Sequence, residues 1–348
     1  MSSWRLEWPW ADGEPAGSGT LKSCPEDFRV TEILETGGPV LELAPLALPE
    51  QLAVPGQGEH LLIYLEKTGD NTSWVASELG KLAGCGDRGV GYCGLKDRHA
   101  VTRQWFSVQR PGLEADDAGF LQAVQGMQAQ WQVLAVARRE RKLRTGEHRA
   151  NRFEVRLRNL TGDSGAITGR LQAIRNHGCP NYFGSQRFGH EGGNLDRAIS
   201  MAANAGRNRR KRRGGRNREG LYLSAARSWL FNEVLAERVI QGNWDSMLEG
   251  EPTSEPSGPL WGDGGTLATG LQEGLEREVV ARHPEMAQVF ASSRMAPDRR
   301  PLRVLPADLD WSFHQSGDNH WLDLSFTLSP GQYATTLLSS VIEIDATR

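Results

Sequence analysis

Residues Gly91–Val108 read GYCGLKDRHAVTRQWFSV and join a glycine-punctuated loop to a run of β-branched and aromatic side chains. The run Thr102–Val108 is typical of a strand, and the loop before it carries Lys, Asp, Arg and His at positions 96–99. A charged quartet directly before a predicted strand is either a solvated turn or a functional loop, because both kinds of loop lie on protein surfaces. Taken alone, the local sequence favours the solvated turn.

Asp97 is the acidic member of this quartet, and a cation stands on each side of it in the sequence. We expect Lys96 and Arg98 to hold the Asp97 carboxylate in its ionised form, because a nearby opposite charge favours ionisation. The charge pattern by itself does not separate a catalytic carboxylate from a solvated one.

Length and composition limit the classes of protein to which this chain can belong. A chain of 348 residues is near the practical limit of a single hydrophobic core, so two domains are expected. Its hydrophobic content of 38% and charged content of 24% suit a soluble globular protein. No run of about 18 apolar residues occurs, and the start MSSWRLEWPWADGEP lacks the pattern of a signal peptide. We therefore expect a cytoplasmic protein.

The sequence predicts neither a metal centre nor a bound cofactor. Cys85 and Cys93 are too far apart for a CxxC zinc knuckle, and no second pair completes a site with His177 and Cys179. No GxGxxG motif follows a predicted strand, and no P-loop or GxSxG motif occurs. Dinucleotide-dependent, NTPase and serine-hydrolase chemistry are therefore not expected.

The first half of the chain has the element order of an α+β fold. Its strands often follow one another without a helix between them, which favours a mixed or antiparallel sheet over a Rossmann fold. Glu32 shares a strand face with Phe28 and Val30, so it lies either at the edge of the core or in a pocket. We expect the exposed edge, because charged groups are rarely buried unpaired. Predicted strands occupy 21–35, 60–66, 130–137 and 151–158, and predicted helices occupy 71–83, 111–127 and 164–177.

The pattern changes at Cys179–Pro180, where a loop rich in glycine and aromatic residues begins. Helical periodicity follows over 195–205, 221–240 and 271–290, and then a strand at 320–328 and a helix at 333–344 are predicted. The simplest architecture is one domain, 1–178 and 302–348, interrupted by a mainly helical domain at 179–301. Three small independent units are the alternative.

Two clusters of basic residues point to a polyanionic partner, although the net charge is −3. RNRRKRRGGRNR occupies 207–218 and RRERKLR occupies 138–144. Either cluster could be a solvated surface, but such a concentration in an otherwise acidic protein favours phosphate binding. Neither resembles an RRM, KH or zinc-finger signature. We expect contacts with an RNA backbone from Arg138, Arg139, Arg141, Lys142, Arg144, Arg209, Arg210, Lys211, Arg212 and Arg213.

Several separated motifs together resemble the TruD family of tRNA pseudouridine synthases. They include GLKDRHAVTRQW at 94–105, RRERKLRTG at 138–146 with NRF at 151–153, and PNYFGSQRFG at 180–189. LKSCPEDFRVTE at 21–32, LSAARSWLFNEVLAER at 223–238 and PGQYATTLL at 330–338 also match, so the likeness covers nearly the whole chain in family order.

The resemblance implies an enzyme that isomerises a uridine of tRNA to pseudouridine without a cofactor, at position 13 in the bacterial branch. It implies a pseudouridine-synthase α+β domain with an inserted, mainly helical TRUD domain. The partner would be tRNA, with no membrane and no nucleotide cofactor, and we expect a monomer. Arg187 and Phe188, in QRFG, are expected to hold the hinge between the domains. The basic run at 207–218 is longer than the family leads us to expect.

The resemblance also implies roles for single residues. Asp97 matches the catalytic aspartate, which would either attack the ribose C1′ or abstract the C2′ proton to form a glycal. Both routes stay open. Phe153 matches the position that stacks on uracil, and base flipping is expected because the target must leave its stack. Asn151 could hydrogen-bond the base or order the Asp97 loop. Other residues expected at the substrate pocket are Lys22, Glu26, Phe28 and Lys96.

Two other classes of function are left open by the sequence. A catalytically silent RNA-binding or chaperone protein could keep this fold, although it would have no need of Asp97. A small-molecule enzyme or a structural protein would leave both basic clusters without a partner.

Overall fold

The chain folds into two compact units, which we name by their main content. The helical unit comprises 1–16, 165–305 and 332–342, and the sheet unit comprises 17–164, 306–331 and 343–348. The computed structural model describes residues 4–44, 48, 51–204, 216–291, 293 and 295–345. Among these residues, no helix combines the length and the apolar character that crossing a membrane requires.

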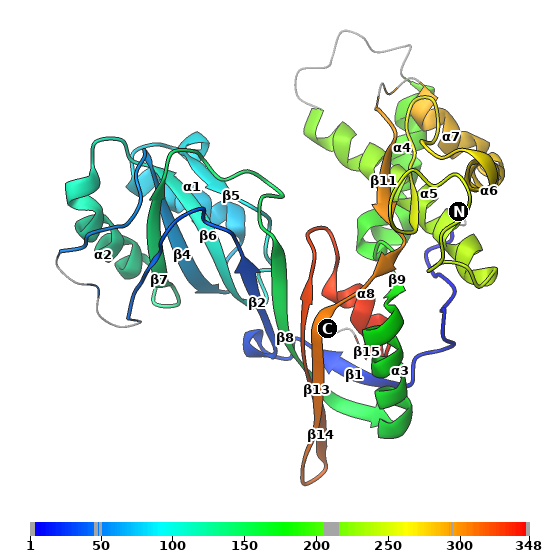
Figure 1. Ribbon diagram of the computed structural model, residues 1–348, viewed down its shortest axis with the longest axis horizontal. Coiled ribbons are helices and arrows are strands. Elements are labelled where there is room, and N and C mark those ends of the chain that lie inside the picture. Colours follow the sequence, from blue (N-terminus) through cyan, green and yellow to red (C-terminus); the bar gives the residue numbers. More distant parts are fainter. Residues whose placement is uncertain are drawn as a thin grey trace. The chain divides into compact units, whose positions relative to one another are not determined.

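The sheet unit is built on one mixed sheet, which has eleven strands in the described residues (Figure 1). Its strands are β1 (Gly17–Leu21), β2 (Phe28–Ile33), β3 (Leu41–Glu42), β4 (His60–Thr68), β5 (Val90–Tyr92), β6 (Val101–Gln109), β7 (Gln132–Arg139), β8 (Ala150–Gly162), β13 (Ala307–Ser316), β14 (Asn319–Leu328) and β15 (Glu343–Asp345). The main path runs β13–β14–β8–β2–β6–β4–β7–β3. The pairs β2–β6 and β1–β15 are parallel, and the remaining pairs are antiparallel.

The long strand β8 connects the two halves of this sheet because it pairs with β1, β2 and β14. Its residues alternate between buried and exposed positions, as expected for a strand with one face against a core. Phe153 lies opposite Val30 of β2 on one side and Phe326 of β14 on the other. The hydrophobic pattern therefore fixes the register, because a slip by one residue would turn the buried set to the opposite face.

Two helices cover one face of the sheet, α1 (Thr72–Leu82) and α2 (Asp117–Met127). Val75 and Leu79 of α1 and Leu121 and Val124 of α2 are fully buried in one cluster with Phe106 of β6. Their spacing of three and four residues puts each pair on one side of its helix. This packing fixes the start of α1 beside β6, where the charged loop ends.

The helical unit is organised around its longest helix, α5 (Arg216–Ile240), which is labelled in Figure 1. The α5 residues Trp229, Leu230 and Phe231 are buried in the core. The short strands of the unit form two antiparallel pairs. The other elements are α3 (Ser164–His177), α4 (Gly193–Ala203), α6 (Gly270–Ala281), α7 (Pro284–Ala291), α8 (Ala334–Ser339), β9 (Cys179–Pro180), β10 (Ser257–Leu260), β11 (Asp298–Pro301) and β12 (Arg303–Val304).

The N-terminal segment packs on α5 and so belongs to the helical unit. The Trp4 ring meets Trp229 edge-on at 5.1 Å, and Trp229 Nε1 donates to the Arg5 carbonyl at 2.8 Å. Trp8 stacks on Tyr182 at 5.8 Å. The unit boundaries therefore differ from the predicted domain boundaries, which grouped the first 178 residues with the sheet.

Two predicted helices differ from the observed elements, and one long strand was not predicted. The helix expected over 271–290 is two helices, because Pro284 begins α7 and proline cannot continue the preceding helix. The helix expected over 333–344 is limited to α8, and β15 follows it. Strand β13 was not predicted, because nearly all of its residues are exposed and it lacks a clear apolar face.

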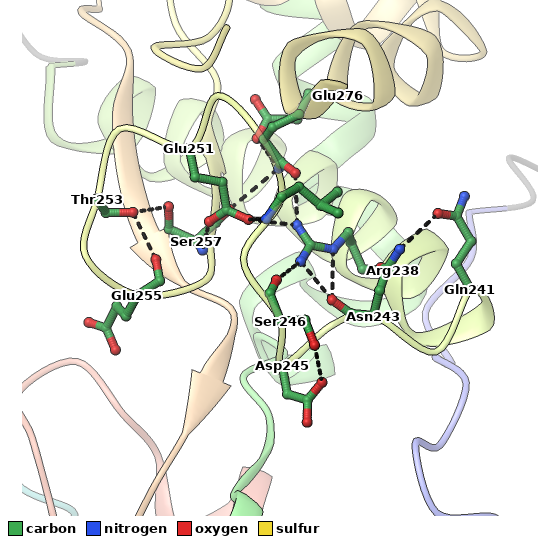
Figure 2. Close-up of polar contacts among 12 residues, drawn as sticks. Arg238, Gln241, Asn243, Asp245, Ser246, Glu251, Thr253, Glu255, Ser257 and Glu276 are labelled. Carbon is green, nitrogen blue, oxygen red and sulfur yellow. Dashed lines mark hydrogen bonds and ion pairs between the residues drawn. The ribbon is translucent and has the colours of Figure 1, made fainter. Parts of the chain in front are cut away.

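A fully buried arginine ties a long loop to the helical core (Figure 2). The side chains of Arg238 and Glu251 are both 0% exposed, and Arg238 Nη1 lies 2.9 Å from Glu251 Oε1. The guanidinium also donates to Gln272 Oε1 at 2.7 Å, to the Asn243 carbonyl at 2.6 Å, and to the Ser246 carbonyl. These bonds satisfy the desolvated charge, as burial of an ion pair requires.

A second buried pair continues this network. Arg299 Nη1 of β11 lies 2.6 Å from Glu276 Oε1 of α6, and both side chains are nearly inaccessible. Gln272 joins the two pairs, because its amide nitrogen donates to Glu276 while its oxygen accepts from Arg238. α5, α6 and β11 are therefore linked by one polar network inside the unit.

We predict that Arg238→Met lowers the free energy of unfolding by about 3–5 kcal/mol, because it leaves the buried Glu251 carboxylate without its cation. The matched control is Arg277→Met, which removes an exposed arginine paired with Glu273 four residues away. That change should cost less than about 1 kcal/mol. Urea unfolding monitored by tryptophan fluorescence measures both, and equal effects would contradict the network's role.

Candidate active site

The loop 93–100 that joins β5 to β6 is fixed by hydrogen bonds from two neighbouring elements. The amide of Lys96 donates to Thr72 Oγ1 at the start of α1 at 2.9 Å, and Gln104 Nε2 of β6 donates to the Gly94 carbonyl at 3.1 Å. Thr72 Oγ1 in turn donates to Gln104 Oε1 at 2.8 Å. Thr72 and Gln104 are both buried, so the loop is anchored to the core before it reaches Asp97.

Lys96 forms a buried ion pair beneath the loop. Its Nζ lies 2.6 Å from Glu32 Oε2, and the two side chains are 5% and 0% exposed. The other oxygen of Glu32 accepts from the Trp105 amide at 3.1 Å. The expectation that Glu32 lies at an exposed edge was wrong, because Lys96 supplies the cation that permits its burial. Lys96 also does not present its amine to solvent.

Asp97 projects from this anchored loop, and its side chain is 57% exposed. Lys22 Nζ donates to Asp97 Oδ2 at 2.6 Å. The neighbouring Arg98 turns away, because its Nε donates to the Gly69 carbonyl at 2.9 Å. The expectation that Lys96 and Arg98 are the cations that act on the Asp97 carboxylate is therefore corrected. The cation in contact with Asp97 is Lys22, which lies 75 residues away in the sequence.

Three aromatic rings extend from Lys22 along the sheet. Its Nζ lies 4.2 Å from the centroid of the Phe28 ring. Phe28 meets Phe153 edge-on at 5.9 Å, and Phe153 stacks on Phe326 at 5.4 Å. Phe153 is only 7% exposed, so most of its ring is already covered by protein. The structure thus brings Lys22, Phe28 and Phe153 together with Asp97, and adds Phe326, which the sequence did not single out.

Asn151 lies opposite Glu32 in the β2–β8 register and contacts a buried histidine. Its Nδ2 is 3.0 Å from His148 Nε2. Burial, together with the nearby charge of Lys96, lowers the pKa of His148 below its ordinary value despite the opposing influence of Glu32. Among the described residues, Asn151 Oδ1 and His148 Nδ1 are buried without a hydrogen-bond partner. His148 is a polar neighbour of the site that the sequence analysis missed.

Lys67 of β4 is a second residue that the sequence did not single out. Its side chain is buried, and its Nζ donates to the Asp70 carbonyl at 2.7 Å. Burial lowers the pKa of Lys67 to about 8, with the charge of Lys96 acting in the same direction and those of Asp70 and Asp97 opposing it. A lysine at a strand end normally extends into solvent, so only the three-dimensional packing identifies this one.

The cluster at 138–144 divides between the core and the surface. Arg138 is buried, and its guanidinium donates to both carboxylate oxygens of Asp117 at 2.8 Å. Arg138 is therefore wrong as an RNA contact, because its donors are committed to the core. Arg139 pairs with Glu147 at 2.6 Å, and Lys142 Nζ donates to the Arg88 carbonyl. Arg141 and Arg144 are exposed.

Glu26 and the second basic cluster are the remaining predicted site residues. Arg209, Arg210, Lys211, Arg212 and Arg213 are outside the described residues. Glu26 is exposed and borders a cavity of about 400 Å³ beside β2, β8 and β14. Side chains such as Arg29 and Glu154 line this cavity, at positions that alternate with Phe28 and Phe153. Asp97 is not among its lining residues.

Fold and site together define an α+β protein that holds one exposed carboxylate beside an aromatic cluster, an arrangement suited to nucleophilic or acid–base chemistry on a planar substrate. A family model described as tRNA pseudouridine synthase D (TruD) matches residues 9–197. A relative named tRNA pseudouridine synthase D from Marinobacter nauticus is 51% identical over 99% of this chain and 96% of its own length. The chain belongs to the TruD family.

Other similar proteins agree with this assignment. A tRNA pseudouridine synthase D from Pseudomonas putida is 36% identical, with 99% of this chain and 97% of the relative covered. The crystal structure of a putative tRNA pseudouridine synthase D from Methanosarcina mazei matches with a TM-score of 0.68 and 16% identity. The match covers 99% of this chain and 97% of that one, and at this identity it supports the fold.

We predict that Lys96→Met and Glu32→Gln destabilise the protein non-additively. Lys96→Met leaves a buried carboxylate unpaired and should cost about 3–5 kcal/mol, whereas in the double variant the remaining side chains are neutral and part of that loss should be recovered. Lys81→Met is the control, because Lys81 is 68% exposed in a pair within α1. Chemical denaturation measures the wild type and the four variants, and strictly additive effects would refute the coupling.

Proposed function

We propose that this protein isomerises a uridine of tRNA to pseudouridine, and that Asp97 is the catalytic carboxylate. The main observation in support of this proposal is that the Asp97 carboxylate is exposed. Its sequence neighbours Lys96 and Arg98 are bonded to other groups. If Asp97 were only an exposed residue of a surface turn, its loop would not need to be anchored by buried hydrogen bonds from α1 and β6. Family membership supplies the reaction and the tRNA substrate.

The isomerisation can use the carboxylate in two ways. As a nucleophile, an oxygen of Asp97 bonds to the ribose C1′ while the N1–C1′ bond breaks, and C5 of the rotated uracil later displaces the carboxylate. As a base, the carboxylate takes the C2′ proton as that bond breaks, leaves a glycal, and returns the proton when C5 has added to C1′. In both routes C5 loses a proton and N1 gains one, so no atom is added or removed.

Lys22, Phe28 and Phe153 fit this reaction as positioning and substrate-binding groups. The hydrogen bond from Lys22 orients the carboxylate, and its contact with Phe28 fixes the amine. Stacking is strong but weakly directional, so an aromatic ring such as Phe153 suits a base that must be held and yet rotate. The uridine has to leave its stack to reach Asp97, which makes base flipping part of the proposal.

The finer features of the substrate follow from the resemblance and from exposed charge. We propose position 13 of tRNA as the target, and Arg141 and Arg144 as contacts of the sheet unit with phosphates, since both side chains are exposed. Lys96 is reassigned from a substrate contact to a support of the loop, because its amine is bonded to Glu32. A tRNA substrate also accords with the cytoplasmic residence that we predict.

The test is Asp97→Asn, compared with Asp87→Asn, which changes an exposed aspartate ten residues earlier. The first variant should fold and bind tRNA but form no pseudouridine, because an amide is neither a nucleophile nor a base here. The control variant should retain activity within about twofold, a change of less than about 0.5 kcal/mol in the barrier. Tritium release from uridine-labelled tRNA measures the reaction.

Retained activity in Asp97→Asn would refute the assignment of Asp97. A wild-type protein that binds tRNA without releasing tritium would instead indicate the catalytically silent RNA-binding protein. Pseudouridine mapping of total tRNA, with and without this protein, identifies the modified position.

A further inference from the structure

Two arginines from motifs that the proposed chemistry does not use meet in the helical unit at Phe183. Arg187, in the 3₁₀-helix η4 (Ser185–Phe188), places its guanidinium carbon 5.4 Å from the centroid of the Phe183 ring. The guanidinium carbon of Arg300, in β11, lies 4.1 Å from the centroid of the same ring. Phe183 itself is buried, so the two cations share one fixed aromatic support.

The contacts of Arg187 in the described part of the chain carry no negative charge. Its Nη2 donates to Ser224 Oγ at 2.5 Å and its Nε to Ser228 Oγ at 3.3 Å, both on α5. The third contact is the Phe183 ring. This differs from Arg238 and Arg299 in the same unit, each of which meets a buried glutamate.

Arg300 adds a second positive charge to the same place. Its Nη2 donates to Asn181 Oδ1, a neutral acceptor, at 2.6 Å. Burial, with the charge of Arg187 acting in the same direction and Tyr333 opposing it, lowers the pKa of Arg300 to about 10. The two guanidinium groups are therefore close enough to repel each other, and both stack on the Phe183 ring.

An exposed aromatic residue and the nearby sequence add to the surroundings of this pair. Tyr333 is 42% exposed and close enough to influence the charge of Arg300 electrostatically. The sequence RNRRKRRGG at 207–215 directly precedes α5, which begins at Arg216. Ser224 follows that start by eight residues, or about 12 Å along a helix. Arg187 thus contacts, through Ser224 and Ser228, the helix that follows the basic run in the sequence.

We propose that Arg187 and Arg300 form a binding site for a phosphate group of the RNA backbone. Guanidinium forks match phosphate oxygens bidentately, and arginines already stacked on a ring lose less freedom on binding than free ones do. A phosphodiester would supply the negative charge that the contacts of Arg187 lack. The site deepens the proposed function, because it assigns the helical unit a share in binding the tRNA that the sheet unit modifies.

The experiment compares tRNA binding and turnover of the wild type, Arg187→Gln and the control Arg277→Gln over a series of salt concentrations. Arg187→Gln should weaken tRNA binding about tenfold, as expected for loss of a hydrogen bond to a charged group. It should also reduce the slope of log affinity against log salt by about one. The rate constant at saturating tRNA should stay within about twofold, because Asp97 is unchanged. Arg277→Gln should alter none of these values.

Inorganic phosphate separates a general anion site from an RNA site. Phosphate that stabilises the wild type against heat but not Arg187→Gln, with equal tRNA affinity in both, would overturn the RNA assignment in favour of a small anion. Unchanged tRNA affinity and salt slope in Arg187→Gln would also overturn it. Pseudouridine formation would continue in either case, so the proposed function would stand.

A second variant covers the possibility that Arg187→Gln does not fold. Ser224→Ala removes the hydroxyl that orients the Arg187 guanidinium and leaves the helix intact. It should weaken tRNA binding about threefold, with an unchanged rate constant at saturation, in keeping with loss of one hydrogen bond. Wild-type affinity in a folded Ser224→Ala protein would count against the site.

Discussion

The buried ion pair between Lys96 and Glu32 is the constraint on which the candidate active site depends. Both side chains are almost completely removed from water, so each charge is compensated by its partner and not by solvent. The pair joins β2 to the loop between β5 and β6, and the Trp105 amide adds a bond to the same carboxylate. Because Lys96 is held below the loop, the next residue, Asp97, is directed outward, and Lys22 becomes the cation that reaches it.

Much of the sheet could be predicted from the sequence because its strands alternate between one buried and one exposed face. β8 and β14 follow that rule, and α1 follows its helical equivalent. β13 does not, because it is an edge strand that is exposed on nearly every residue and therefore carries no hydrophobic period. The boundary of the helical unit also escaped prediction, since the tryptophans near the N-terminus reveal their partner only through contacts with α5.

At the candidate active site, the sequence indicated which residues belong to the site but not which side chains contact one another. Asp97, Phe28, Phe153 and Lys22 do lie together, but their pairing depends on contacts between distant parts of the chain. Sequence neighbours suggested that Lys96 faces Asp97, whereas the loop turns successive side chains in different directions. Arg138 shows the same difficulty: an arginine in a basic run is bound inside the protein by Asp117, which no local pattern indicates.

Lys22 shows how selection on stability and selection on activity can favour different residues at one position. Its φ of 61° lies in the left-handed region, which costs a residue with a Cβ about 1–2 kcal/mol relative to the right-handed region. Glycine would adopt this conformation without that cost, but it has no amine to reach Asp97. A screen for thermal stability alone would therefore favour glycine at residue 22 and, under the proposed function, lose the group that orients the carboxylate.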